Sequence, residues 1–190
     1  MTWIVGIFNS ENAEMARQRE DSDLTDALEL YSHYRSATGD LKIINLEKAY
    51  IEDPSIKYFI DGEIANLKKA IENIYFQKMD CEQQEMVKFQ VTGALVGMTG
   101  SGYYPSLENW QKTLGDFLIW LSADITYNPK TKKADAIVAV HSIDIYNFNR
   151  GAADVFTGLP DNPNGRFAEL GWAKSFITKG NFTINVEWSF

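Results

Sequence analysis

Two long runs of β-branched and aromatic residues dominate the second half of the chain. They span residues 117–127 (FLIWLSADITY) and 136–148 (AIVAVHSIDIYNF), and the segment between them, NPKTKK, contains Pro129 and three lysines. Such runs favour strands, proline suits the second position of a turn, and lysines keep a loop in water. The sequence therefore predicts a β-hairpin, which commits this part of the chain to an antiparallel sheet.

A further strand is predicted near the C-terminus. Apolar residues alternate there with polar ones, at Phe182, Ile184, Val186 and Trp188. A period of two is typical of a strand with one buried face. Between the hairpin and this strand, the segment PNGRFAELGWAKSF predicts a short helix, with Pro163 in its first turn and Asp161 or Asn162 as its cap.

The first half of the chain instead shows apolar residues at helical spacing. Four helices are predicted, beginning at Leu24 with Asp23 as the cap, at Pro54, at about Glu82 and at Ser106. Helices followed by a small antiparallel sheet with one inserted helix define an α+β fold. We expect a mainly helical region, 1–112, and a sheet region, 113–190, that together form one compact unit.

The net charge argues against a nucleic-acid partner. Lys and Arg number 18 against 26 Asp and Glu, and of the resulting charge of −8, −7 falls in residues 1–90. A domain this acidic is repelled by phosphate backbones, so we expect no nucleic acid among its partners.

The N-terminus, MTWIVGIFNS, has neither the basic region of a signal peptide nor the apolar length of a membrane span. We expect the chain to be made in the cytoplasm without a signal peptide. Its single cysteine, Cys81, cannot form an internal disulfide, so packing must supply the stability.

The densest group of polar residues lies at the end of the second run. Strand alternation places Asp144 and Tyr146 on one face and His141 and Asn147 on the other. A carboxylate can act as a general base or hold a cation, and a phenol can donate to developing charge. All four are candidate catalytic residues, with Asp144 and Tyr146 as the leading pair. The alternative is that Asp144 caps the following turn and Tyr146 packs in the core.

The loop after this strand and the predicted helix carry four candidate substrate-binding residues, Arg150, Arg166, Asp154 and Asp161. Arginines bind phosphate or carboxylate by forked hydrogen bonds, although surface ion pairs are an alternative role. Asp residues also stabilise tight turns. Together with Asp144, the two aspartates offer oxygen ligands for Mg²⁺ or Ca²⁺, but their spacing identifies no metal site.

Residues 113–188, with LGDF before the hairpin, DIYNFN at the strand end and TGLPDNPNGRFAELGWAKSF beyond it, resemble the C-terminal toxin domains of bacterial polymorphic and type VI secretion effectors. The strand end is also similar to the core motif of colicin M-like bacteriocins, which cleave the lipid-linked peptidoglycan precursor in the periplasm.

The core motif of that family reads Asp, any residue, Tyr, Asp, five residues, His and Arg. Asp144 and Tyr146 match its first two positions. The remaining three positions are occupied by Asn147, Ala153 and Asp154. Arg150, Arg166 or His141 would then have to supply the missing groups from elsewhere in the fold.

The resemblance implies an antibacterial effector that is delivered into the periplasm of a target bacterium and acts on a lipid-linked envelope substrate. It implies a cognate immunity protein as a partner and, if the chain is an enzyme, a phosphoester hydrolase. Two other classes remain open. A non-enzymatic membrane-disrupting toxin would use the glycine-rich helix predicted from Glu82, and an acidic immunity or binding protein would use the acidic first half to bind a basic partner.

Overall fold

The computed structural model describes residues 24–73, 85–154 and 157–190. Its elements are, in chain order, α3 (Thr25–Arg35), β1 (Lys42–Ile43), α4 (Leu46–Glu52), α5 (Pro54–Ile71), β2 (Val87–Thr92), β3 (Val96–Gly97), the 3₁₀ turn η2 (Thr99–Ser101), α6 (Glu108–Leu114), β4 (Leu118–Asn128), β5 (Lys133–Tyr146), α7 (Asn162–Glu169) and β6 (Phe176–Ser189). The expected α+β class is confirmed.

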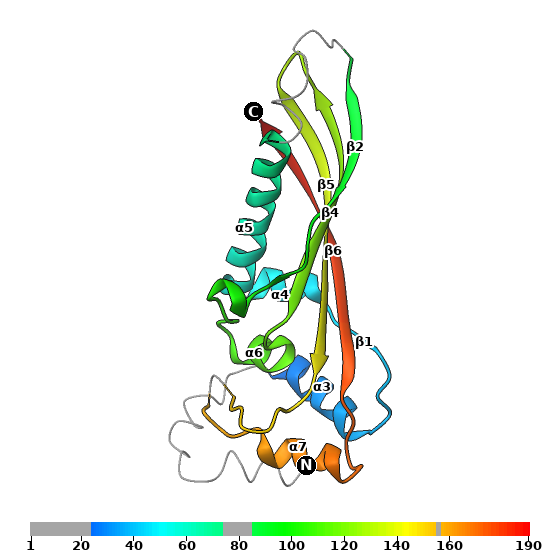
Figure 1. The fold of residues 1–190 in the computed structure, drawn as a ribbon, viewed down its shortest axis with the longest axis vertical. Coiled ribbons are helices and arrows are strands. Elements are labelled where there is room, and N and C mark those ends of the chain that lie inside the picture. The colour runs from blue at the N-terminus through cyan, green and yellow to red at the C-terminus, as the bar shows by residue number, and fades with distance from the viewer. Residues whose placement is uncertain (1–23, 74–84, 155–156) are drawn as a thin grey trace.

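The hairpin predicted from the sequence forms the centre of a mixed, six-stranded sheet with the strand order β1-β6-β5-β4-β2, in which β3 also pairs with β4. β4 pairs antiparallel with β5 along its whole length, and β6 pairs antiparallel with all of β5 as far as Tyr146↔Phe176. The short strand β1 runs parallel to β6. The sheet is long and twisted, with α4, α5 and α6 on one side of it and α3 and α7 near its lower end (Figure 1).

One face of β5 packs into the core. Ala134, Ala136, Val138 and Val140 are buried, whereas the residues between them are half-buried or exposed. The core cluster joins this face to apolar residues of the helices, among them Ile56, Ile60 and Trp110. Because side chains alternate along a strand, the same face continues to Ser142, Asp144 and Tyr146.

The start of α5 agrees with the sequence. Pro54 occupies the first turn, and the buried carboxylate of Asp53 accepts hydrogen bonds from the backbone N–H groups of Ser55 (2.9 Å) and Ile56 (3.0 Å). Asp53 also accepts from the N–H of Leu107 (2.7 Å), at the start of α6. A single buried side chain therefore satisfies free backbone donors at two helix ends.

The prediction of a helix from about Glu82 is wrong for the part of this segment that the structure describes. Val87–Thr92 is a strand, β2, that pairs antiparallel with β4. Val87, Phe89 and Val91 are half-buried and the residues between them exposed, so the segment follows a period of two. Of the glycines that follow, Gly97 belongs to β3 and Gly100 to η2. The half expected to be helical thus contributes strands to the sheet.

The other predicted helices form close to their expected positions. α3 begins one residue after Leu24, α6 two residues after Ser106, and α7 contains Pro163 in its first turn. The sequence reading missed α4, which Asn45 caps by accepting from the N–H of Lys48 (3.0 Å). The division into regions 1–112 and 113–190 stays a prediction.

Three expectations concern residues outside the described ranges: the expected cap Asp23, the N-terminal segment MTWIVGIFNS, and Cys81. Within the described ranges, none of the helices combines the length and the apolar character that a membrane crossing requires.

Candidate functional site

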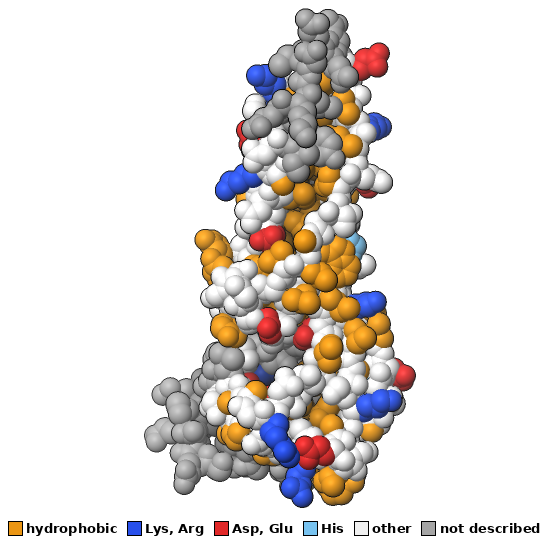
Figure 2. All heavy atoms as spheres, viewed as in Figure 1, with side chains coloured by type: hydrophobic (Ala, Val, Ile, Leu, Met, Phe, Trp, Pro, Cys, Tyr) orange, Lys and Arg blue, Asp and Glu red, His pale blue; other side chains and the backbone are white. Residues whose placement is uncertain are grey.

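A pocket of about 1000 Å³ opens where β5 ends, bordered by α3, α6, the start of β4, the loop after β5 and the start of α7. The molecular surface is hollowed in the lower half of the view, with apolar and acidic side chains at the edge of the hollow (Figure 2). Its apolar lining includes Leu24, Ala27, Leu28, Leu114, Leu118, Ile143, Ile145, Leu159, Pro160 and Pro163. The charged residues that line it are Lys112, Asp116, Asp144, Asp154 and Asp161.

Asp144 lies in this pocket on the covered face of β5, as the alternation predicts. Its Oδ1 accepts from the N–H of Ile145 (2.7 Å). Burial raises the pKa of Asp144 to about 6, and the nearby carboxylate of Asp116 adds to the increase, against the hydrogen bond from Ile145. A carboxyl group that titrates near neutral pH can both accept and donate a proton under physiological conditions.

Tyr146 lines the pocket two residues further along the same face. Its ring stacks on Phe176 with centroids 5.1 Å apart, and it also contacts Phe148 (5.7 Å) and Tyr34 (6.0 Å). Burial raises the pKa of the Tyr146 phenol well above its usual range, so the hydroxyl stays protonated. A rigidly packed, protonated phenol can act as a hydrogen-bond donor.

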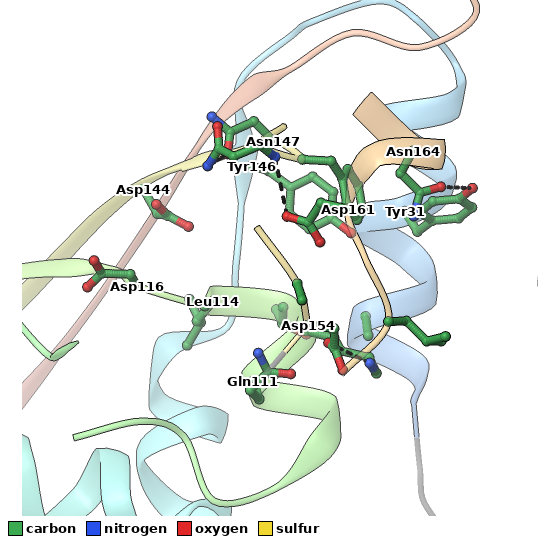
Figure 3. Close-up of a pocket in the computed structure, with 18 of the residues that line it drawn as sticks. Tyr31, Gln111, Leu114, Asp116, Asp144, Tyr146, Asn147, Asp154, Asp161 and Asn164 are labelled. Carbon is green, nitrogen blue, oxygen red and sulfur yellow. Dashed lines mark hydrogen bonds and ion pairs between the residues drawn. The ribbon is translucent and has the colours of Figure 1, made fainter. Parts of the chain in front are cut away.

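The helix α7 closes the lower side of the pocket through close packing. A Cβ on Gly165 would lie 2.9 Å from the carbonyl oxygen of Phe148, so a glycine is needed where α7 meets the end of β5. Asn164 accepts from the hydroxyls of Tyr31, through Oδ1 (3.1 Å), and of Tyr34, through its carbonyl oxygen (3.0 Å). These contacts fix α7 against α3 (Figure 3).

Asp154 lines the pocket from the loop after β5 and is held from both sides. Its Oδ1 accepts from the N–H (2.6 Å) and the hydroxyl of Thr157, and its Oδ2 pairs with Lys112 Nζ (2.7 Å). Burial acts to raise the pKa of Asp154, but the hydrogen bonds from Lys112 and Thr157 outweigh it and lower this pKa. Asp154 therefore stabilises its own turn and an ion pair with α6.

Asp161 faces the pocket from the residue before α7. Its carboxylate does not cap the helix; Oδ2 accepts from the N–H of Asn149 (3.2 Å), and the neighbouring Asn162 Oδ1 accepts from Gly151 (2.9 Å). Asp161 thus occupies the expected N-cap position of α7, but neither side chain caps the helix, because both turn back to hold the loop. Burial raises the pKa of Asp161, and Asp154 raises it further.

Three of the candidates do not line this pocket. His141 lies on the opposite face of β5, where it stacks on Trp120 (centroids 4.8 Å apart) and shares a hydrogen bond with Ser122 Oγ (3.0 Å). Arg150 is exposed and pairs with Glu169 (3.3 Å), and Arg166 is exposed on α7. The exposed Asn147 does line the pocket, and its Oδ1 accepts from Asn149 Nδ2 (3.3 Å).

Sequence reasoning missed three polar residues of the pocket: Gln111, Lys112 and Asp116. The first two lie on α6, which the sequence marks only by its apolar residues. Asp116 stands two residues before β4, in the LGDF segment. The one signal in the sequence was its place just before a predicted strand, because a residue at the start of a strand lies at the end of the sheet, where sites are often found.

The four aspartates do not make a ready metal site. Over residues 24–73, 85–154 and 157–190, no group of three or more His, Cys, Asp or Glu side chains converges closely enough to hold an ion. Asp116 and Asp144 lie toward one end of the pocket, and Asp154 and Asp161 toward the other (Figure 3). An Mg²⁺ ion bound here would need a ligand's oxygens to complete its shell.

The sequence matches no protein-family model and no curated protein. The fold is similar to that of PaeM, described as a colicin M-like bacteriocin produced by Pseudomonas aeruginosa, with a TM-score of 0.52 and 9% sequence identity. The similarity covers 87% of this chain and 51% of that protein, so the chain spans about half its length. The expected resemblance to colicin M-like bacteriocins is thereby confirmed for the fold. The resemblance to polymorphic and type VI effectors stays a prediction.

Proposed function

We propose that the chain is an antibacterial toxin domain that hydrolyses a phosphoester bond of a lipid-linked peptidoglycan precursor. The proposal is carried by one observation: Asp144, whose pKa is raised to about 6, and the protonated phenol of Tyr146 line the same pocket. The fold is similar to that of a colicin M-like bacteriocin.

The lining of the pocket suits a substrate that has an apolar part and a polar part. Leu28, Leu118, Ile145 and Leu159 line the pocket and are each at least 39% exposed, so their apolar surface is available to a ligand. Burying such surface against a hydrocarbon chain is favourable, by about 25 cal/mol per Å². The polar groups at Asp144 and Tyr146 would then face the polar part of the same molecule.

In the proposed reaction, Asp144 accepts a proton from a water molecule as the water oxygen attacks phosphorus. The ester P–O bond breaks, and the released alcohol oxygen takes up the proton that Asp144 has accepted. The Tyr146 hydroxyl donates a hydrogen bond to a phosphoryl oxygen, where negative charge increases in the transition state.

An acidic pocket admits a phosphate most readily together with a divalent cation. Mg²⁺ is commonly held by one or two carboxylates together with the phosphates of a substrate. Asp116, whose carboxylate lies near Asp144, is the residue that would hold such an ion, which leaves Asp144 to accept the proton. The ion would neutralise phosphate charge, while Asp154 stays engaged with Lys112.

The test is growth of a sensitive bacterium that expresses the chain in the cytoplasm or, with an added signal sequence, in the periplasm. Asp144→Ala is compared with Asp135→Ala, which changes an exposed carboxylate on the same strand. We expect killing from the periplasm alone, lost with Asp144→Ala and kept with Asp135→Ala. Killing by a folded Asp144→Ala protein would contradict the proposal.

The two other classes make different predictions. The membrane-disrupting toxin loses its structural basis, since the helix that it needed is the strand β2 over residues 87–92. An acidic binding protein would kill from neither compartment. In the proposed account the acidic protein is itself the toxin, delivered into the periplasm of a target cell, and its producer carries a cognate immunity protein.

A further inference from the structure

Lys112 supplies the positive charge of the pocket. Among the described residues that line it, there are four aspartates and no other Lys, Arg or His. Lys112 Nζ pairs with Asp154 Oδ2 at 2.7 Å and lies 3.7 Å from Glu108 Oε1. Its side chain is 22% exposed and lines the pocket.

The ion pair is built so that Asp154 can lose Lys112 without losing its place. The two oxygens of Asp154 have separate partners: Thr157 donates to Oδ1, and Lys112 donates to Oδ2. The contact between Asp154 and Thr157 therefore does not depend on the ion pair. An anionic oxygen from a ligand can replace Asp154 Oδ2 as the partner of Lys112 Nζ. One charged hydrogen bond is lost and an equivalent one forms.

The neighbouring residue gives a second sign of a ligand at this place. Gln111 lines the pocket, is 8% exposed, and its Oε1 has no hydrogen-bond partner among the described residues. A buried acceptor without a donor costs about 1–3 kcal/mol. Figure 3 shows Gln111 and Asp154 next to each other at this part of the pocket. Because Oε1 has almost no accessible surface in this arrangement, a ligand whose anionic oxygen binds Lys112 and that also carries a donor group would satisfy Gln111 as well through a rotation of the Gln111 side chain toward the pocket.

We propose that Lys112 is the anion-binding residue of the pocket, and that Asp154 holds it in an ion pair that the ligand's anionic group replaces. This inference rests on the proposed function only for the identity of the anion as a phosphate. It assigns the positive charge of the site to a residue of α6, in place of Arg150 and Arg166, which the sequence had suggested.

The test is calorimetric titration of the purified chain with methylenediphosphonate, a diphosphate analogue that resists hydrolysis, with MgCl₂ present throughout. Lys112→Met removes the positive charge, and Asp154→Asn removes the competing negative charge but keeps an acceptor for Thr157. Lys42→Met is the matched control, because Lys42 forms a comparable ion pair with Glu29 (2.6 Å) outside the pocket. Thermal unfolding establishes that each variant is folded.

We expect Lys112→Met to weaken binding by at least about tenfold, the size of one charge-assisted hydrogen bond. Asp154→Asn should tighten binding by about threefold or more, and Lys42→Met should leave it unchanged. The opposite directions matter, since a purely structural ion pair predicts that loss of either partner lowers stability and neither changes affinity. Three results would overturn the inference: lower stability with unchanged affinity in both variants, equal binding by Lys112→Met and the unaltered chain, or no binding by the unaltered chain.

The experiments distinguish failure of the proposed function from failure of this inference. If periplasmic killing survives Asp144→Ala while anion binding still depends on Lys112, the phosphoesterase proposal fails and the anion-binding residue stands. If killing depends on Asp144 but Lys112→Met binds the analogue normally, the reverse holds.

Discussion

Asp116 and Asp144 face the same pocket from the segments that lead into β4 and out of β5, and the charge of Asp116 adds to burial in raising the pKa of Asp144 to about 6. Neither carboxylate has a cation beside it among the contacts that the structure shows; Lys112 is paired with Asp154 instead. The site thus keeps a carboxyl group poised between its two protonation states.

This pairing predicts the pH dependence of activity. A general base must be deprotonated, so the rate of phosphoester hydrolysis should rise as the pH increases through about 6 and fall below it. The measurement is the initial rate on a lipid-linked diphosphate substrate from pH 4.5 to 8. A rate that is constant across this range would rule out Asp144 as the base.

The same raised pKa predicts the effect of Asp144 on stability. The pKa is higher in the folded state, about 6, than the ordinary value of an aspartate, 3.8. The folded state therefore binds the proton more tightly, and stability is lost as the pH rises from about 4 to about 6. Asp144→Asn removes the buried charge and should raise the free energy of unfolding at pH 8 by about 1–3 kcal/mol.

Urea denaturation at pH 8 and pH 4 measures this effect. The gain from Asp144→Asn should vanish at pH 4, where the wild-type carboxyl group is protonated. Asp135→Asn, on the exposed face of the same strand, serves as the control and should change stability by less than about 0.5 kcal/mol at either pH. An Asp144→Asn protein that is less stable than wild type at pH 8 would contradict the expectation.

The double cap at Asp53 predicts a large loss of stability. Asp53 is fully buried and accepts from the N–H groups of Ser55, Ile56 and Leu107, so Asp53→Ala leaves donors of two helices without a partner. We expect a loss of about 3 kcal/mol. The matched control, Asn45→Ala, removes an exposed cap with one bond and should cost about 1 kcal/mol. Equal losses in chemical denaturation would show that the second helix end gains nothing from Asp53.

The arrangement of the aspartates predicts that Mg²⁺ binds together with a phosphate ligand. No three ligating side chains converge in the described part of the chain, so Mg²⁺ alone should bind weakly. In calorimetry, the affinity for Mg²⁺ should increase at least about tenfold when methylenediphosphonate is present, and EDTA should abolish hydrolysis. Equal Mg²⁺ affinity with and without the analogue would argue against a shared ion.

The placement of His141 predicts that it is dispensable for activity. It stacks on Trp120 on the face of the sheet opposite Asp144, and it does not line the pocket. His141→Ala should leave the rate of hydrolysis within about twofold of wild type, although the lost stacking and hydrogen bond should cost about 1–2 kcal/mol of stability. Arg150→Ala, at an exposed ion pair, should likewise leave the rate unchanged. A loss of activity of tenfold in either folded variant would place that residue in the reaction.

Much of the fold could be predicted because its signals are local. The hairpin of β4 and β5, the closing strand β6 and the helices after Asp53 and Ser106 each follow from periodicity or from a cap within a few residues. The strand β2 could not be predicted in this way. Its apolar residues fit a helix or a strand over so short a segment, and its pairing with residues of β4 that lie 30 to 40 positions away decides between them.

For the candidate site, the alternation of side chains along an extended chain was enough to predict that Asp144 and Tyr146 share one face of a strand. No local pattern could predict that this face meets Lys112, Asp116 and Asp154 in one pocket, while His141 lies on the other face. These residues lie far apart along the chain. Lys112 and Asp154 are 42 residues apart, and their 2.7 Å contact exists because α6 packs beside the end of the sheet, which no local pattern encodes.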